Sequence, residues 1–251
     1  MELKNEPKYL VAYLDLLGTE KIFEKDINNQ TKLINDLLSI YETALGDVKR
    51  VSNAVVDCNL KTNIFSDNIL IAIDYDENNS EAEQEQLKLQ IFLTFVAKIQ
   101  FISFTRGYLL RGGIDYGDLY INQTFCIGKT LIDTYHIENK VAKYPRIVTN
   151  NIKIVEDSKK IQRLNTKFLK DSDGKFFLDF LNFFDNEASK KMAYAKIPNL
   201  YNKKFEEDIK GAKQIVEKIE WTINYYNKNC SGLPLQEYRL NTLSVEEEYA
   251  K

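Results

Sequence analysis

Two aspartates stand where an ionised side chain needs a partner. Asp15 lies in the run YLDLLG, inside a segment otherwise typical of a buried strand, and Asp67 lies at the tip of FSDNILIAI. Burying an unpaired carboxylate is costly, and two carboxylates that converge repel each other unless a cation lies between them. Oxygen ligands on a rigid sheet edge suit Mg²⁺ or Mn²⁺ bound together with substrate phosphates. One interpretation is therefore a divalent-ion site.

A second interpretation needs no ligand. Asp15 could cap a short helix over residues 19–23, and Asp67 could serve a hairpin turn, both common uses of aspartate. Five of the ten glycines lie between Gly107 and Gly128, a density that marks tight turns or close approach of the backbone. Spacing alone favours neither interpretation.

The elements that must position these residues alternate between strands and helices. Their order, β, α, ββ, α, ββ, α, β, predicts an α/β sheet covered on one face, in which the first strand and the following hairpin are neighbours. Asp15 and Asp67 would then converge on one side of the sheet. The expected elements are a strand over 8–16, a helix over 31–45 ended by Gly46, strands near 54–65 and 68–73, a helix over 78–104 with Ser80 and Glu83 in capping-box spacing, a strand over 109–115, a turn at 116–118, a strand over 119–123, a helix over 128–142 and a strand over 145–150.

Composition excludes several classes of protein. The net charge of −3 comes from acidic and basic residues spread along the chain, which leaves no footprint for nucleic acid. Three separated cysteines and one histidine argue against a disulfide framework and against a zinc site. No run of apolar residues is long enough to span a bilayer. We expect a soluble, cytoplasmic protein with no membrane partner.

Four segments, YLVAYLDLLG, FSDNILIAI, LLRGGIDYG and FCIGKTLIDTYHIENKVAKYPRIVTN, follow one another between residues 9 and 150. In this order they resemble the catalytic domain of the class III nucleotidyl cyclases, the family of adenylate and guanylate cyclases. The resemblance implies that Asp15 and Asp67, helped by the Leu16 carbonyl, hold two Mn²⁺ or Mg²⁺ ions. It also implies that Arg111 contacts the nucleotide phosphates, although an arginine here could instead pair with a carboxylate across the sheet. Lys175 is similar to a triphosphate-binding lysine, with a solvated turn lysine as the alternative.

The sequence departs from the family pattern at the base and ribose positions. The family's helix asparagine and arginine fall on Ile132 and His136, with Asp133 beside the vacancy. The resemblance makes His136 and Asp133 the candidate catalytic residues there, with a surface histidine as the alternative for His136. The base-contacting positions fall on Asn63 and Phe125, which match neither the adenine nor the guanine pattern. These losses resemble the bacterial pyrimidine cyclases of the Pycsar anti-phage systems, which make cyclic UMP or cyclic CMP.

The resemblance implies a ferredoxin-like catalytic domain with a mixed, mainly antiparallel sheet over residues 8–180. A helical extension over 181–251, with an amphipathic helix at 204–228, would follow. It further implies a homodimer with its active sites at the interface and a nucleoside triphosphate as substrate. Three alternatives stay open: a purine cyclase, a cyclase-like module that binds nucleotide without turnover, and a structural protein whose carboxylates only cap helices and turns.

Overall fold

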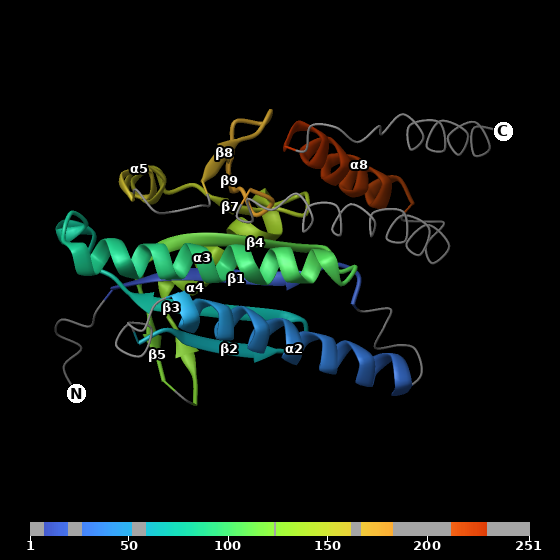
Figure 1. The fold of residues 1–251 in the computed structure, drawn as a ribbon, viewed down its shortest axis with the longest axis horizontal. Helices are drawn as coiled ribbons and strands as arrows, with labels where there is room; N and C mark the ends of the chain where they lie inside the picture. Colours follow the sequence, from blue (N-terminus) through green and yellow to red (C-terminus); the bar gives the residue numbers. More distant parts are fainter. Residues whose placement is uncertain are drawn as a thin grey trace. The chain divides into compact units, whose positions relative to one another are not determined.

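A seven-stranded mixed sheet organises the first part of the chain in the computed structural model (Figure 1). The structure describes residues 8–19, 27–51, 59–122, 124–161, 167–182 and 212–229. The chain divides into two compact units, residues 1–185 and residues 186–251, and the whole sheet belongs to the first.

The centre of the sheet has ferredoxin-like topology. The strands run in the order β2-β3-β1-β4, each antiparallel to its neighbour, and helices link β1 to β2 and β3 to β4. Strand β7 adds to β4 in parallel, and β9 and β8 complete the edge. The predicted mixed, mainly antiparallel sheet with covering helices is confirmed. The bounds are β1 Lys8–Leu16, α2 Ile27–Val51, β2 Lys61–Phe65, β3 Asn68–Asp74, α3 Glu83–Thr105, β4 Leu110–Asp118, β7 Ile147–Thr149, α5 Ile152–Lys160, β8 Phe168–Lys170 and β9 Phe176–Leu178.

Both faces of this sheet are covered, which corrects the prediction that helices cover one face. Helices α2 and α3 lie together over one face (Figure 1). The other face carries α4 (Lys129–His136), which packs on β4 and β1, and the short strand β5 (Tyr120–Ile121), which pairs with β6 (Cys126–Ile127). Helix α3 is long and apolar enough to span a membrane, but most of it is buried within the protein, as in a core helix.

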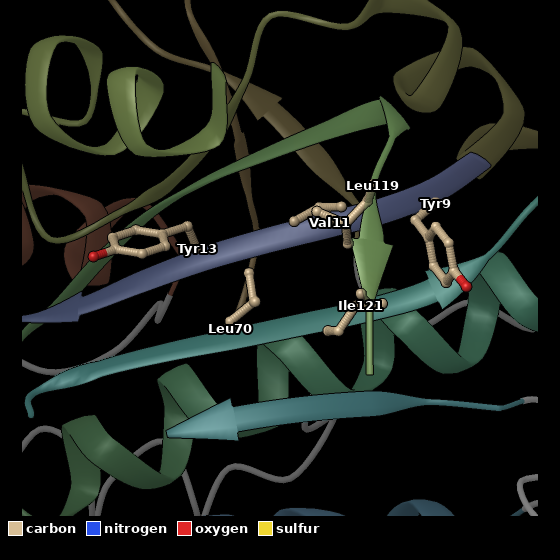
Figure 2. Close-up of a cluster of buried hydrophobic side chains, with 7 residues drawn as sticks. Tyr9, Val11, Tyr13, Leu70, Leu119 and Ile121 are labelled. Carbon is tan, nitrogen blue, oxygen red and sulfur yellow. The ribbon is translucent and has the colours of Figure 1, made fainter. Parts of the chain in front are cut away.

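The face that carries α4 and β5 also carries the alternate residues of β1. Figure 2 shows Tyr9, Val11 and Tyr13 along β1, with Leu119 and Ile121 on the segment that crosses β1 near Val11. Side chains alternate along a strand, so Asp15, two residues beyond Tyr13, lies on the same face. The apolar cluster thus fills one end of the face, and the charged residues begin where it stops.

Several local predictions were wrong at element boundaries. Helix α2 continues through Gly46, because a glycine inside a helix costs only about 1 kcal/mol and does not end it by itself. No turn forms at residues 116–118, because β1 starts early enough for Lys8 to pair with Asp118 and keep β4 in the ladder. Ser80 does not cap α3: the N-cap is Ala82, without a side-chain bond. The expected strand residues 54–58 lie outside the described residues.

The predicted helix over 128–142 is present, but its end differs from an α-helix. After α4 the chain makes a π-helical turn, η3, from Ile137 to Val141. In the second unit, α8 (Ala212–Asn229) overlaps the helix expected at 204–228, and residues 183–211 are outside the described part. The division into a catalytic domain over 8–180 and an extension over 181–251 stays a prediction.

Candidate functional site

Asp15 and Asp67 lie at the same end of neighbouring strands. Asp15, near the end of β1, pairs in register with Asn68 of β3, and Asp67 directly precedes Asn68 in the turn between β2 and β3. The Leu16 backbone N–H donates a hydrogen bond to the Asp67 carbonyl oxygen at 3.1 Å. The turn is tight, since Ser66 has a positive φ of 54°. The predicted adjacency of strand and hairpin therefore holds.

The Thr19 hydroxyl lies within hydrogen-bond distance of both the Asp67 carboxylate and the Leu16 carbonyl oxygen. The side-chain hydroxyl of Thr19 lies against Asp67 Oδ2 and 3.3 Å from the Leu16 carbonyl oxygen, and Thr19 is buried. The Asn68 side-chain amide donates to Asp67 Oδ1 at 3.0 Å. The Asp67 carboxylate is therefore held in a fixed orientation from two sides.

Arg111 supplies the positive charge next to Asp15. It is the register partner of Asp15 on β4, and its Nε donates a hydrogen bond to Asp15 Oδ2 at 3.1 Å. The same Nε lies 2.5 Å from Oε1 of Glu138 in the η3 turn. The alternative of an arginine paired across the sheet is thus the arrangement seen here. It also explains how a carboxylate is tolerated at Asp15.

Glu138 is the buried member of this cluster, with only 2% of its surface exposed. Burial raises the pKa of its carboxyl group to about 7; the Arg111 guanidinium opposes that rise, and the carboxylates of Asp15 and Asp67 add to it. Burial first, and then the charges of Glu138 and Asp15, raise the pKa of Tyr13 to about 12, with Asp67 contributing. Among the described residues, the carboxyl groups of Asp15, Asp67 and Glu138 therefore act on one small region that also holds the Arg111 guanidinium.

A glycine in β4 lets the helix carry Glu138 this close. A Cβ atom added at Gly113 would lie 2.4 Å from the Thr134 carbonyl oxygen and 2.8 Å from Ile137 Cβ, so only glycine fits beneath the end of α4. The π turn follows at once and changes the helical register, a feature often found at functional sites. These two features bring Glu138 against Arg111, two residues before Gly113 on the same face.

The residues present fit a divalent cation if a ligand completes its coordination. Within the described part of the chain, no three His, Cys, Asp or Glu side chains are grouped so that they could hold an ion by themselves. Asp15, Asp67 and the Leu16 carbonyl would supply oxygen atoms only, which suits Mg²⁺ or Mn²⁺, whose remaining positions take water or phosphate oxygens. The convergence of negative charge from Asp15, Asp67 and Glu138 favours such a cation.

The predicted base-contacting residues lie on two different elements. Asn63 of β2 pairs with Leu70, the register partner of Tyr13, so its half-buried side chain is on the face of the site. Phe125 is 53% exposed and stacks on Tyr120, with ring centroids 5.5 Å apart, beside the β5–β6 ribbon.

The predicted residues of α4 are exposed or half-buried. Asp133 forms an ion pair with Lys129 one turn earlier, and His136 is exposed, with its ring 5.7 Å from that of Tyr135. Ile132 is 56% exposed. No contact between described residues joins Asp133 or His136 to the carboxylate cluster.

Lys175 lies in the turn between β8 and β9. Its backbone N–H donates to Asp173 Oδ1 at 3.1 Å, and its carbonyl oxygen accepts from the Asp171 N–H at 2.9 Å. Strands β4 and β7 separate β9 from β1, and no contact among the described residues connects Lys175 with Arg111. Within one chain the structure therefore brings together Asp15, Leu16, Asp67 and Arg111, but not Lys175.

Two residues of the cluster, Glu138 and Thr19, were not predicted from the sequence. Thr19 directly follows Gly18 at the end of the first motif, and a hydroxyl at that position was a usable signal. Glu138 gave a weaker signal, since helical periodicity continued from α4 does not anticipate a π turn.

Comparison with known proteins gives distant likenesses in structure. No protein-family model and no curated protein matches this sequence. A bacterial light-regulated adenylyl cyclase has a TM-score of 0.42 at 10% identity, covering 76% of this chain and 98% of its own. The guanylyl cyclase Cya2 has a TM-score of 0.34 at 10% identity, and the match covers 68% of this chain and 89% of that one. A second structure of a bacterial light-regulated adenylyl cyclase has a TM-score of 0.38 at 10% identity, and the match covers 79% of this chain and 60% of that one.

Proposed function

We propose that this protein is a metal-dependent nucleotidyl cyclase that converts UTP or CTP to the 3′,5′-cyclic mononucleotide and pyrophosphate. One observation carries the proposal: Asp15, near the end of β1, lies next to the turn that holds Asp67, whose carbonyl oxygen accepts a hydrogen bond from Leu16 N–H, and Arg111 lies beside Asp15. Carboxylates at the same end of two adjacent strands could share a cation with a bound triphosphate.

The roles of the residues follow from their chemistry. Asp15, Asp67 and the Leu16 carbonyl would hold the two ions, and the planar guanidinium of Arg111 would bind phosphate oxygens. When bound, the ions would lower the pKa of the ribose 3′-hydroxyl and neutralise charge on the triphosphate. The 3′ oxygen forms a bond to the α-phosphorus, the bond to the leaving pyrophosphate breaks, and the hydroxyl proton passes to solvent.

A pyrimidine substrate is supported by the side chains at the base-contacting positions. Asn63 offers one donor group and one acceptor on the face of the site, and Phe125 offers only packing. The combination lacks the purine-reading pattern of adenylate and guanylate cyclases. We place the product as a second messenger of a cytoplasmic bacterial anti-phage response, as in the pyrimidine cyclases that the sequence resembles.

A homodimer would complete the site. No contact among the described residues joins His136 or Asp133 to the cluster, and Lys175 lies in a turn of β8 and β9, which two strands separate from β1. A second copy facing this surface could supply them, which is the arrangement that the family resemblance implies. The exposed Ile132 and Tyr135 on α4 would then be covered.

A second candidate is a module that binds nucleotide without turnover. The side chain of Ile132 cannot form hydrogen bonds, and Arg111 is already paired with Asp15 and Glu138. The two candidates share a ligand and differ in whether a bond to phosphorus is made.

The test uses the purified full chain with Mn²⁺ and each of the four nucleoside triphosphates. We expect cyclic UMP or cyclic CMP with equimolar pyrophosphate, and a loss of more than about a hundredfold in rate for Asp15→Asn and Asp67→Asn. The matched control is Asp118→Asn, an exposed carboxylate at the opposite end of β4, which should keep wild-type activity.

Each outcome selects one function. Nucleotide binding measured by calorimetry, without release of pyrophosphate, selects the binding module. Cyclic AMP or cyclic GMP as the main product keeps the cyclase and overturns the pyrimidine substrate. The absence of both binding and product, with no change in melting temperature on adding Mn²⁺ and nucleotide, overturns both candidates.

A further inference from the structure

Glu138 has no assigned task, although it is the most deeply buried acid of the cluster. We propose that Glu138 is a positioning residue that, together with Asp15, holds the guanidinium of Arg111 in the orientation needed to bind a phosphate group. The proposal rests on the proposed function in one respect, that Arg111 binds phosphate.

The geometry of Arg111 shows what the two acids do. Its Nε–H is aligned with Asp15 Oδ2 at 3.1 Å, while Oε1 of Glu138 lies 2.5 Å from the same Nε without an aligned hydrogen bond. Both acids thus engage the inner end of the guanidinium. Hydrogen bonds from Arg111 to other described residues do not occur, so its two terminal amino groups stay available for a bidentate contact with phosphate oxygens.

The position of Glu138 is built into the fold. It belongs to the η3 turn, which is anchored by the contact of Thr134 and Ile137 with Gly113. Because the helix end that carries Glu138 is fixed against β4, the carboxylate has a fixed place. Its contact with Arg111 therefore restricts the guanidinium to that place. A long arginine side chain loses considerable rotamer freedom on binding, and fixing it beforehand lowers that cost.

If Glu138 acted through its charge alone, its effect on phosphate affinity would be the opposite of the one proposed. A negative charge beside Arg111 repels phosphate, so removing the charge of Glu138 should strengthen phosphate binding if charge alone matters. The experiment therefore compares two neutral replacements of similar size. Glu138→Gln retains an oxygen atom near Nε, and Glu138→Met has none.

The probe is inorganic tripolyphosphate, titrated by calorimetry into the full chain at a fixed Mn²⁺ concentration. We expect Glu138→Met to bind it about tenfold more weakly than Glu138→Gln, the size expected for loss of one polar contact to a charged group. Equal affinities, or tighter binding by Glu138→Met, overturn the proposal. In an Arg111→Ala background the two replacements should bind equally, and a persisting difference also overturns it.

A third variant covers the case in which Glu138→Met fails to fold. Glu138→Asp keeps the charge but is one methylene shorter, so it should bind tripolyphosphate several-fold more weakly than the wild type; unchanged affinity overturns the proposal.

The experiments distinguish failure of the positioning role from failure of the proposed cyclase activity. A wild type that binds tripolyphosphate without cyclising any nucleotide overturns the cyclase alone, and one that cyclises nucleotide while the Gln and Met variants bind alike overturns the positioning role alone. A wild type that binds no polyphosphate overturns both.

Discussion

Replacing Gly113 with alanine should destabilise the protein and disturb the candidate site at the same time. The new methyl group would lie 2.4 Å from the Thr134 carbonyl oxygen and 2.8 Å from Ile137 Cβ. Real Cβ atoms do not approach other atoms so closely, and a backbone carbonyl cannot rotate away as a side chain can. The end of α4 must therefore move off β4.

The size of the effect follows from overpacking of a buried contact. Such substitutions cost about 1–3 kcal/mol, and in a protein of this length each kcal/mol lowers the melting temperature by about 2–4 °C. We expect Gly113→Ala to melt about 6 °C below the wild type, using the midpoint of both ranges.

Gly46→Ala is the matched control, for which we expect a rise in melting temperature. Gly46 lies inside α2, and an added Cβ meets nothing within 4 Å. Alanine in a helix interior is favoured over glycine by about 1 kcal/mol, so this variant should melt about 3 °C above the wild type. Thermal unfolding of the full chain followed by circular dichroism measures both. A Gly113→Ala protein that melts at or above the wild-type temperature would refute the close packing of α4 on β4.

Two further predictions concern buried charges. The carboxyl group of Glu138 binds its proton more tightly in the folded chain, with a pKa of about 7 against an ordinary value of 4.5. The contribution of Glu138 to the free energy of unfolding should therefore fall by at most about 3 kcal/mol as the pH rises from 4.5 to 7. Above pH 7 it should stay constant. Urea unfolding at a series of pH values should show that Glu138→Gln lacks this fall, and equal slopes would contradict the assignment. Arg146 has a fully buried side chain that forms ion pairs with Asp171 and Asp173, so Arg146→Met should lower the free energy of unfolding by about 3 kcal/mol. A loss below about 1 kcal/mol in the same assay would mean that water replaces the arginine.

The central sheet could be predicted from the sequence because its signals are local and repeated. Nearly continuous apolar runs marked β1 and β3, the short FSDN turn joined two strands, and crossover rules placed the hairpin beside β1. The adjacency of Asp15 and Asp67 followed from that topology alone. Arg111 was identified as well, with a carboxylate across the sheet as one of its two expected partners.

The remaining features depend on tertiary contacts that the sequence does not display. Gly46 is compatible with a helix end or a helix interior, and only the length of α2 decides between them. The π turn that places Glu138 has no sequence signal, so an acid that would be assigned to the solvent-facing side of a helix is instead buried. Ser80 and Glu83 have capping spacing, yet the chain begins α3 after Ala82.

The two glycines that follow Arg111 explain why it meets acids from separate elements. A Cβ atom at Gly112 would lie 2.6 Å from Leu14 Cδ2 on one face, and Gly113 leaves no room for one on the other. Strand β4 therefore has no side-chain bulk where β1 and α4 approach it, and the next side chain on the face of Gly113 is that of Arg111. If Gly113 serves the site through Glu138, Gly113→Ala should weaken binding of tripolyphosphate in the Glu138→Gln background and should have little further effect in the Glu138→Met background. Equal losses in the two backgrounds would show that the glycine serves only the packing of the helix.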